Sequence, residues 1–115
     1  MNSIQRLERL LIMPNYKIII TQRAFSDITE NVLFVKNVSI EAAKELYKEI
    51  IASIQSLSPF PNKYSEIEGL RIKGSRIRKM TIHQGRYIVL YKVEDENVII
   101  YDVIDVRRES TFIKI

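Results

Sequence analysis

The amino-acid sequence predicts an α+β fold in which an antiparallel β-sheet meander is covered on one face by a helical hairpin. Three observations support this prediction. A short β-branched segment comes first, two segments with apolar residues at helical spacing follow, and the last third contains extended apolar runs. The predicted order is strand, helix, helix and three strands (β-α-α-β-β-β), so the two helices must pack on one face of the sheet.

The first strand and the first helix are predicted from residues 16–36. Residues 16–21 are rich in β-branched side chains and follow Pro14, which is typical of a strand. The apolar residues of the next segment recur every three or four positions, as in an amphipathic helix that ends near Asn37. They are Phe25, Ile28, Val32 and Val35.

The second helix begins after Ser39, which fits an N-cap, and has Glu41 in its first turn. Pro59 and Pro61 prevent its continuation. We expect its apolar stripe, like that of the first helix, to belong to the core. The stripe consists of Ala43, Tyr47, Ile50, Ile54 and Leu57.

The meander begins at Arg76, where the period changes from helical to extended. A turn at 83–85 and a polar loop at 94–97 separate its strands. The middle strand is almost continuously apolar, so we expect it to be buried on much of both faces. The predicted strands are residues 76–82, 86–93 and 98–104, with a possible short edge strand at 111–113.

Residues 1–12 are set apart from the single domain predicted for residues 13–115. Ile4, Leu7 and Leu11 are at helical spacing, which favours an accessory amphipathic N-terminal helix. The alternative is that translation begins at Met13 and that residues 1–12 come from an upstream in-frame start. An N-terminus at Met13 or Pro14 in the natively expressed protein would decide for the alternative.

Composition excludes several kinds of chemistry. The chain has no Cys, which rules out disulfides, a thiol nucleophile and thiolate metal sites. With one His it has too few ligands for a zinc centre and is a poor candidate for a Ser-His-Asp triad. We therefore expect no metal and no cofactor. Short apolar runs and the lack of a signal-like segment place the protein in the cytoplasm, without membrane contact.

The formal charge of +4 is unevenly distributed. Residues 1–70 are neutral, residues 71–92 contain seven basic and no acidic side chains, and residues 93–106 contain five acidic ones. A segment as basic as 71–92 attracts phosphate if its charges converge on one face. Composition leaves open a second interpretation, a solvated strand pair balanced by the acidic segment beside it.

Several features occur in an order that resembles the RelE/ParE superfamily of toxins from bacterial type II toxin-antitoxin systems. They are the opening strand, Ala24 and Asp27 in the first helix, Ala43, Ile50, Ile54 and Leu57 in the second, Pro59, Arg78-Lys79-Met80, residues 87–93, Val98-Ile99-Ile100 and Arg107-Arg108. The resemblance covers residues 14–110. It implies a toxin held inactive by a co-expressed antitoxin, whose extended, partly disordered segment wraps around it. The basic stretch, with Arg107 and Arg108, predicts acidic residues in that segment.

The superfamily divides by target. RelE-like members cleave mRNA on the ribosome, whereas ParE-like members poison DNA gyrase and are not nucleases. By resemblance, Lys79 and Arg108 match nuclease positions, but Thr81 and Ile88 stand where a lysine and an arginine are expected, and Phe112 lacks a tyrosine hydroxyl. The incomplete set favours gyrase inhibition. The alternatives are a metal-independent, ribosome-dependent mRNA endoribonuclease and a degenerate member that only binds its antitoxin.

Each candidate site residue also has a structural interpretation. A nuclease would use Lys79, Arg86 and Arg108 as its catalytic set, although Lys79 can be a surface lysine and Arg108 can pair with Asp102 or Asp105. Tyr87 and Tyr91 share a strand face with Val89 and are expected in the core or facing the antitoxin. The candidates for binding nucleic acid or another target are Arg76, Arg78, His83 and Arg107.

Overall fold

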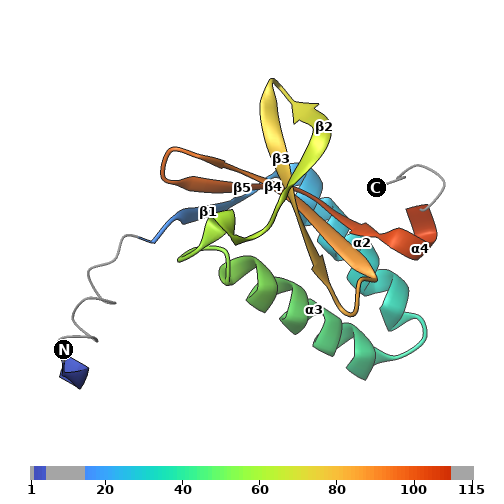
Figure 1. Ribbon diagram of the computed structural model, residues 1–115. Coiled ribbons are helices and arrows are strands. Elements are labelled where there is room, and N and C mark those ends of the chain that lie inside the picture. Colours follow the sequence, from blue (N-terminus) through green and yellow to red (C-terminus); the bar gives the residue numbers. More distant parts are fainter. Residues whose placement is uncertain (1, 5–14, 110–115) are drawn as a thin grey trace.

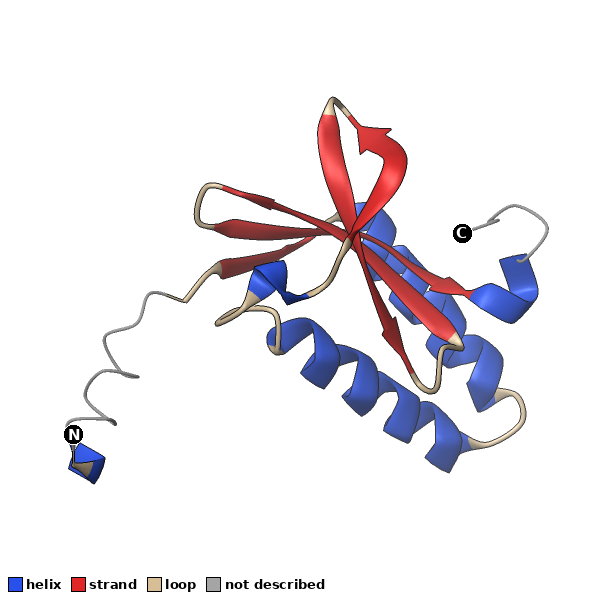
Figure 2. Cartoon of the chain, in the orientation of Figure 1, coloured by secondary structure: helices blue, strands red, loops and turns tan. Residues whose placement is uncertain are grey.

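The computed structural model describes residues 2–4 and 15–109, which form a five-stranded sheet with two long helices packed against one face (Figure 1). Figure 2 shows the same elements coloured by type. In chain order they are β1 (Lys17–Ile20), α2 (Gln22–Lys36), α3 (Ile40–Gln55), the 3₁₀ turn η1 (Pro61–Lys63), β2 (Glu66–Ile72), β3 (Ser75–Ile82), β4 (Tyr87–Glu94), β5 (Asn97–Asp105) and α4 (Val106–Glu109).

The sheet is mixed, with the strand order β1-β5-β4-β3-β2. Strands β3 to β5 form the predicted antiparallel meander, β2 extends it by one further antiparallel strand, and β1 lies parallel to β5 at the edge. The helical hairpin that follows β1 therefore crosses over one face of the sheet. This arrangement confirms the predicted fold class.

The structure confirms the predicted N-cap of α3 and the predicted end of α2. The Ser39 hydroxyl accepts a hydrogen bond from the Ala42 amide at 3.1 Å, and α2 ends at Lys36 with Asn37 as its C-cap. The N-cap of α2 is Thr21, whose hydroxyl accepts from the Ala24 amide at 3.1 Å. Removing such a cap costs about 1 kcal/mol, so these residues fix where each helix begins.

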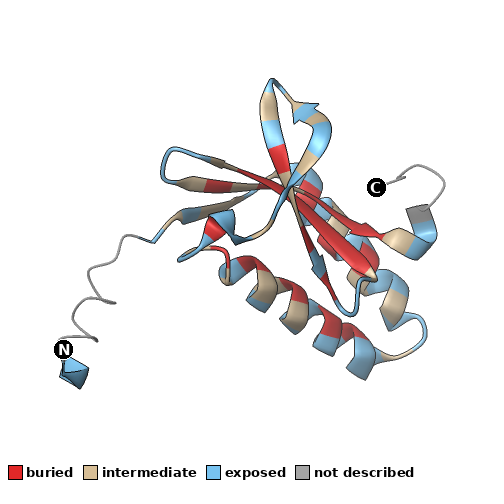
Figure 3. Cartoon of the chain, viewed as in Figure 1, coloured by how far each residue is buried: buried red, intermediate tan, exposed pale blue. Residues whose placement is uncertain are grey.

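The main core lies between the helices and the sheet (Figure 3). Tyr87, Val89 and Tyr91 of β4 face it, which confirms the core assignment of the two tyrosines. The Tyr91 hydroxyl donates to the Pro61 carbonyl at 2.7 Å, and burial raises its pKa to about 12. From the helices and the turn after α3, the buried apolar residues of this core are Ala24, Ile28, Leu46, Ile50, Ile54 and Leu57.

Two residues of the predicted helical stripes do not belong to this core. Phe25 is 62% exposed and Tyr47 is 51% exposed, so their assignment to the core is wrong. The reason is rotational, since α2 buries Ala24, Ile28 and Asn31, a stripe one residue away from Phe25. Helical periodicity identifies a stripe but does not determine which side of it meets the sheet.

A smaller cluster covers the other face of the sheet. Ile88 and Leu90 of β4 belong to it, so β4 is buried on both faces as its continuous apolar sequence predicts. Part of the cover comes from β2, a strand that the sequence analysis missed. Its pairing with β3 is irregular between Glu66 and Arg71, and Gly69 lies at φ 81°, so residues 66–72 lack a clean alternation.

Two sequence predictions concern the ends of the chain. The accessory helix at 1–12 lies largely outside the described residues, and the edge strand at 111–113, which includes Phe112, lies wholly outside them. At the C-terminal end of β5 the described chain turns into α4. Within the described residues, no helix is long and apolar enough to cross a membrane.

Candidate functional site

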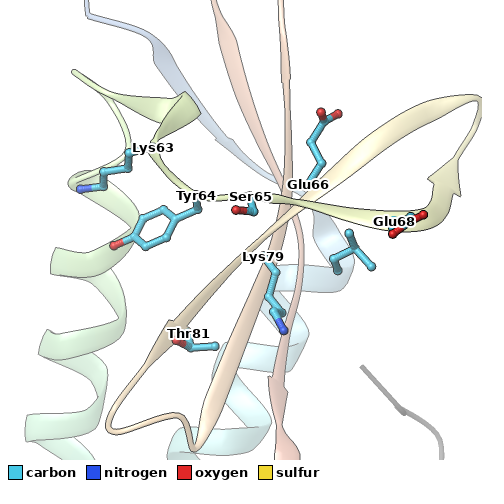
Figure 4. A pocket seen from close by; sticks show the side chains of 8 residues that line it. Lys63, Tyr64, Ser65, Glu66, Glu68, Lys79 and Thr81 are labelled. Atoms are coloured by element: carbon cyan, nitrogen blue, oxygen red, sulfur yellow. The ribbon is translucent and has the colours of Figure 1, made fainter.

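Lys79 lies on β3, on the sheet face that points away from the helices. It lines a cavity of about 480 Å³ together with Thr81 and with residues 63–68, and Figure 4 shows these side chains. Its backbone amide donates to the Ser65 carbonyl at 3.2 Å. The other charged groups around the cavity are Lys63, Glu66 and Glu68, so the cavity is lined by carboxylates as well as cations.

Arg86 lies at the start of β4, beside buried groups. Its Nη2 is 4.0 Å from Oδ2 of Asp105, which is 2% exposed, and its guanidinium lies 5.5 Å from the centre of the Tyr87 ring. Burial raises the pKa of Tyr87, which the positive charge of Arg86 opposes. The positive charge of Arg86 therefore lies beside the buried carboxylate of Asp105 and the buried ring of Tyr87. Few other cations of residues 71–92 contact mainly buried groups.

Arg108 and Arg107 lie in α4 and differ in their contacts. The Arg108 guanidinium donates to Oδ1 of Asn31 at 3.1 Å and lies 4.4 Å from the centre of the Phe34 ring, both in α2. Arg107 is exposed, and its backbone amide donates to Oδ1 of Asp105 at 3.0 Å. Arg108 therefore attaches α4 to the helical layer through Asn31, rather than through Asp102 or Asp105.

Lys79 does not lie with the other two residues of the predicted nuclease set, whereas Arg86 and Arg108 both lie close enough to Tyr87 for their charges to lower its pKa. In the β3–β4 ladder Lys79 lies opposite Leu90, which is three residues from Tyr87 along β4. Lys79 is on the sheet face away from the helices. Arg108 contacts α2, on the helical side. An RNA-cleaving centre needs its base and its phosphate-binding cations around one scissile bond, and in this structure Lys79 and Arg108 serve different faces.

The remaining target-binding candidates lie along β3 and in the turn that follows it. Arg78 donates from Nη1 to the carbonyls of Asn62 and Tyr64, so it holds the η1 segment against the strand. Arg76 is exposed and lies 3.6 Å from Glu66. His83 is in the β3–β4 turn, where its Nδ1 lies 2.8 Å from Oε2 of Glu49 in α3.

The cations of residues 71–92 fall into two groups, those held by contacts within the fold and those exposed to solvent. Lys92 is 8% exposed and pairs with Glu94, whose hydrogen bond raises its pKa. Arg78 is held by backbone carbonyls, whereas Arg71, Lys73 and Arg76 are exposed. No group of three or more His, Asp or Glu side chains among the described residues is arranged to hold a metal ion.

Comparison with known proteins identifies the family. The family described as ParE toxin of type II toxin-antitoxin system, parDE, matches residues 18–110, which is most of the chain. The chain belongs to the ParE toxin family. Among curated proteins there is no match. A solved structure described as the chromosomal ParDE TA system from P. aeruginosa matches with a TM-score of 0.59 and 17% identity, over 76% of this chain and 92% of that chain. At this identity the likeness is one of fold.

In this ParE-family chain, polar side chains of α2 cover the free edge of β5, a feature that sequence reasoning missed. β1 pairs with β5 only as far as Ile100. Beyond it, Oδ2 of Asp27 accepts from the Val103 amide at 3.0 Å, and Nδ2 of Asn31 donates to the Val103 carbonyl at 3.0 Å. The i, i+4 spacing of Asp27 and Asn31 was the available signal, because it places two polar groups on the buried side of a helix.

Asp27 has a strongly perturbed carboxyl group. Burial, and then the neighbouring carboxyl of Asp102, raise its pKa to about 7, although the Val103 amide opposes the shift. Asp102 in turn accepts from Nε of Arg23 at 2.6 Å. The contact between α2 and β5 therefore contains two close carboxyl groups and one arginine, a cluster that responds to pH near neutrality.

The outer side of the ParE-family helical hairpin carries a group of exposed apolar side chains among its charged ones. We call this the helical surface, and its exposed apolar side chains are Phe25, Leu33, Phe34, Ile40 and Tyr47. Part of it is a groove of about 360 Å³ between α2 and α3, which Leu33 and Tyr47 help to line. A second groove of about 590 Å³ holds Leu33 and Phe34 together with the cations Lys36 and Arg108. Exposed apolar area of this kind is typical of a surface that binds another protein.

Proposed function

We propose that this ParE-family toxin arrests growth by inhibiting DNA gyrase. The observation that carries the proposal is the family match over residues 18–110. The separation of Lys79 from Arg86 and Arg108 supports it, because a metal-independent nuclease would need these cations around one phosphate. Thr81 lines the same cavity as Lys79 and offers a hydroxyl where the resemblance to RelE-like members expects a second lysine.

The experiment follows plasmid DNA and mRNA after induction of the chain without its antitoxin. We expect gyrase-linked DNA breaks to accumulate while mRNA stays intact, and we expect purified gyrase to lose supercoiling activity when the chain is added. Rapid mRNA cleavage with unbroken DNA would replace this proposal with the endoribonuclease. Unchanged growth would favour a member that only binds its antitoxin.

A pair of variants separates the two targets at residue level. Lys79→Ala removes the amine from the cavity of Figure 4, and Thr81→Ala is the matched control that lines the same cavity. For a gyrase inhibitor neither variant changes the rate of growth arrest. Loss of toxicity in Lys79→Ala alone, together with stable mRNA, would identify Lys79 as the base of a nuclease.

We further propose that the antitoxin covers the helical surface with an amphipathic, acidic segment. The apolar side chains of that surface need an apolar partner. Lys36 and Arg108 border one of its grooves together with a single carboxylate, Glu30, and this excess of positive charge favours acidic residues at that end of the partner. A partly disordered segment could order on such a surface when it binds. The reading frame next to the toxin gene should therefore encode a small protein with an acidic amphipathic segment.

A further inference from the structure

The β2–β3 hairpin ends in a group of cations that the functions above do not use. We call residues 69–76 the hairpin tip, and they include Arg71, Lys73 and Arg76 but no acidic residue. The two-residue turn joins the paired residues Ile72 and Ser75, with Lys73 at φ 51° and Gly74 at φ 82°. Positive φ at both turn positions is typical of a type I′ hairpin, which favours Asn or Asp before Gly. A lysine there is unusual, and it adds an exposed positive charge at the end of the ribbon.

Arg71 and Arg76 lie directly opposite each other in the ladder. Like charges in this position repel, so the pair costs stability. The compensation is partial: Nη1 of Arg71 donates to the Gly74 carbonyl at 3.3 Å, and Arg76 lies 3.6 Å from Glu66 in a pair that is well exposed. Both arginines line a cavity of about 670 Å³, together with Arg78, Glu66 and Glu68. A folded chain that keeps two opposed arginines beside an exposed lysine has a surface suited to an anion.

The shape of the hairpin distinguishes among anionic partners. Figure 1 shows that the turn end of the β2–β3 hairpin extends away from the helices as a two-stranded ribbon. None of the exposed large apolar side chains of the described residues lies on β2 or β3, so a protein partner would find no apolar anchor at the tip. The major groove of B-DNA admits a two-stranded β-ribbon, whereas the major groove of duplex RNA is too narrow.

We propose that the hairpin tip binds the phosphates of duplex DNA through Arg71, Lys73 and Arg76, with the ribbon in or along the major groove. Binding of this kind rests on the phosphate backbone and is largely independent of base sequence. It requires neither gyrase nor the antitoxin, so it goes beyond the proposed function and is tested without either protein.

The test measures binding of the full chain, made by cell-free synthesis, to a labelled DNA duplex over a range of salt concentrations. The variant is Arg71→Gln/Lys73→Gln/Arg76→Gln. Each lost phosphate contact lowers the slope of log affinity against log salt by about 0.9, so the variant should show a slope shallower by about 3. A slope equal to that of the parent chain would overturn the proposal.

A matched control removes the same charge elsewhere. Lys17, Lys44 and Lys48 are exposed and lie on β1 and α3, so Lys17→Gln/Lys44→Gln/Lys48→Gln should keep the parent slope. The melting temperature of the hairpin variant should stay the same or rise, because the opposed arginines no longer repel. A lower melting temperature together with weaker binding would mean that the arginines only support the fold, and it would overturn the proposal.

Two competitors decide between classes of polyanion. Duplex RNA of the same sequence should bind more weakly than DNA, because its major groove does not admit the ribbon. A polyglutamate peptide of equal charge should not displace the DNA. Displacement by the peptide, or equal binding of RNA, would show that the tip is a general acidic-partner site and would overturn the assignment to DNA.

Discussion

The helical surface and the hairpin tip are both exposed, yet they differ in chemistry. The helical surface presents Phe25, Leu33 and Tyr47 on two regular helices. The hairpin tip presents cations on an irregularly paired ribbon without exposed large apolar side chains. Apolar exposure favours a protein partner, whereas unbalanced positive charge favours phosphate. The difference implies that one small domain can meet an antitoxin and a nucleic acid on separate surfaces.

The largest expected effect comes from the core that supports the helical surface. Ile50 of α3 is fully buried between the helices and the sheet, so Ile50→Ala should lower the free energy of unfolding by about 2–5 kcal/mol. Denaturant unfolding measures this loss. Phe25→Ala is the control on the outer side of the hairpin and should cost far less, because Phe25 is already solvated. Equal losses would mean that the helical surface is part of the core and not a binding surface.

The next effect concerns recognition by a protein partner. Leu33 lines both grooves of the helical surface, and Leu33→Glu should weaken antitoxin binding more than tenfold because it places a charge in an apolar contact. Calorimetric titration with the antitoxin provides the measurement. Val38→Glu, at an exposed loop position outside both grooves, should leave the affinity unchanged. If both variants bind equally well, the antitoxin covers another surface.

A smaller effect is expected from pH at the contact between α2 and β5. Burial raises the pKa of Asp27 to about 7, so between pH 4 and pH 7 the folded state holds a proton that the unfolded state releases. Stability should therefore fall as pH rises through this range and then level off. Asp27→Asn stays neutral while its amide oxygen can still accept from the Val103 amide, so the variant should lose this pH dependence and be more stable than the parent at pH 8. Chemical denaturation at several pH values tests this, and an unchanged profile in Asp27→Asn would assign the titration to another group.

Sequence reasoning located the regular elements because their signals are local. Ser39 marks a cap, the apolar run at 87–93 marks a strand buried on both faces, and both features are present in the structure. It missed β2 because Gly69 and the irregular register interrupt the alternation on which strand prediction depends. A local pattern predicts an element well when the element is regular, and β2 is not.

The candidate site was harder to predict, because it depends on which face each side chain occupies. Lys79 and Arg108 match positions of one family motif, yet register and helix packing place them on different sides of the sheet. The role of Asp27 depends on where β1 ends relative to β5, which is not visible in a linear sequence. The roles of Lys79, Arg86 and Arg108 in catalysis therefore remain predictions for the variants described above.

The smallest expected effect sharpens the comparison at a single residue of the hairpin tip. Lys73→Asn gives the type I′ turn its preferred Asn-Gly sequence and removes one cation. The variant should be more stable than the parent by about 0.5 kcal/mol, since relief of an unfavourable turn residue is a common route to small gains. Its DNA-binding slope should be shallower by about 1, because one phosphate contact is lost. Thermal unfolding and salt titration on the same preparation measure both quantities. A gain in stability without a change in slope would show that Lys73 makes no phosphate contact. If Lys73 is retained for binding DNA, the variant gains stability and its DNA-binding slope becomes shallower.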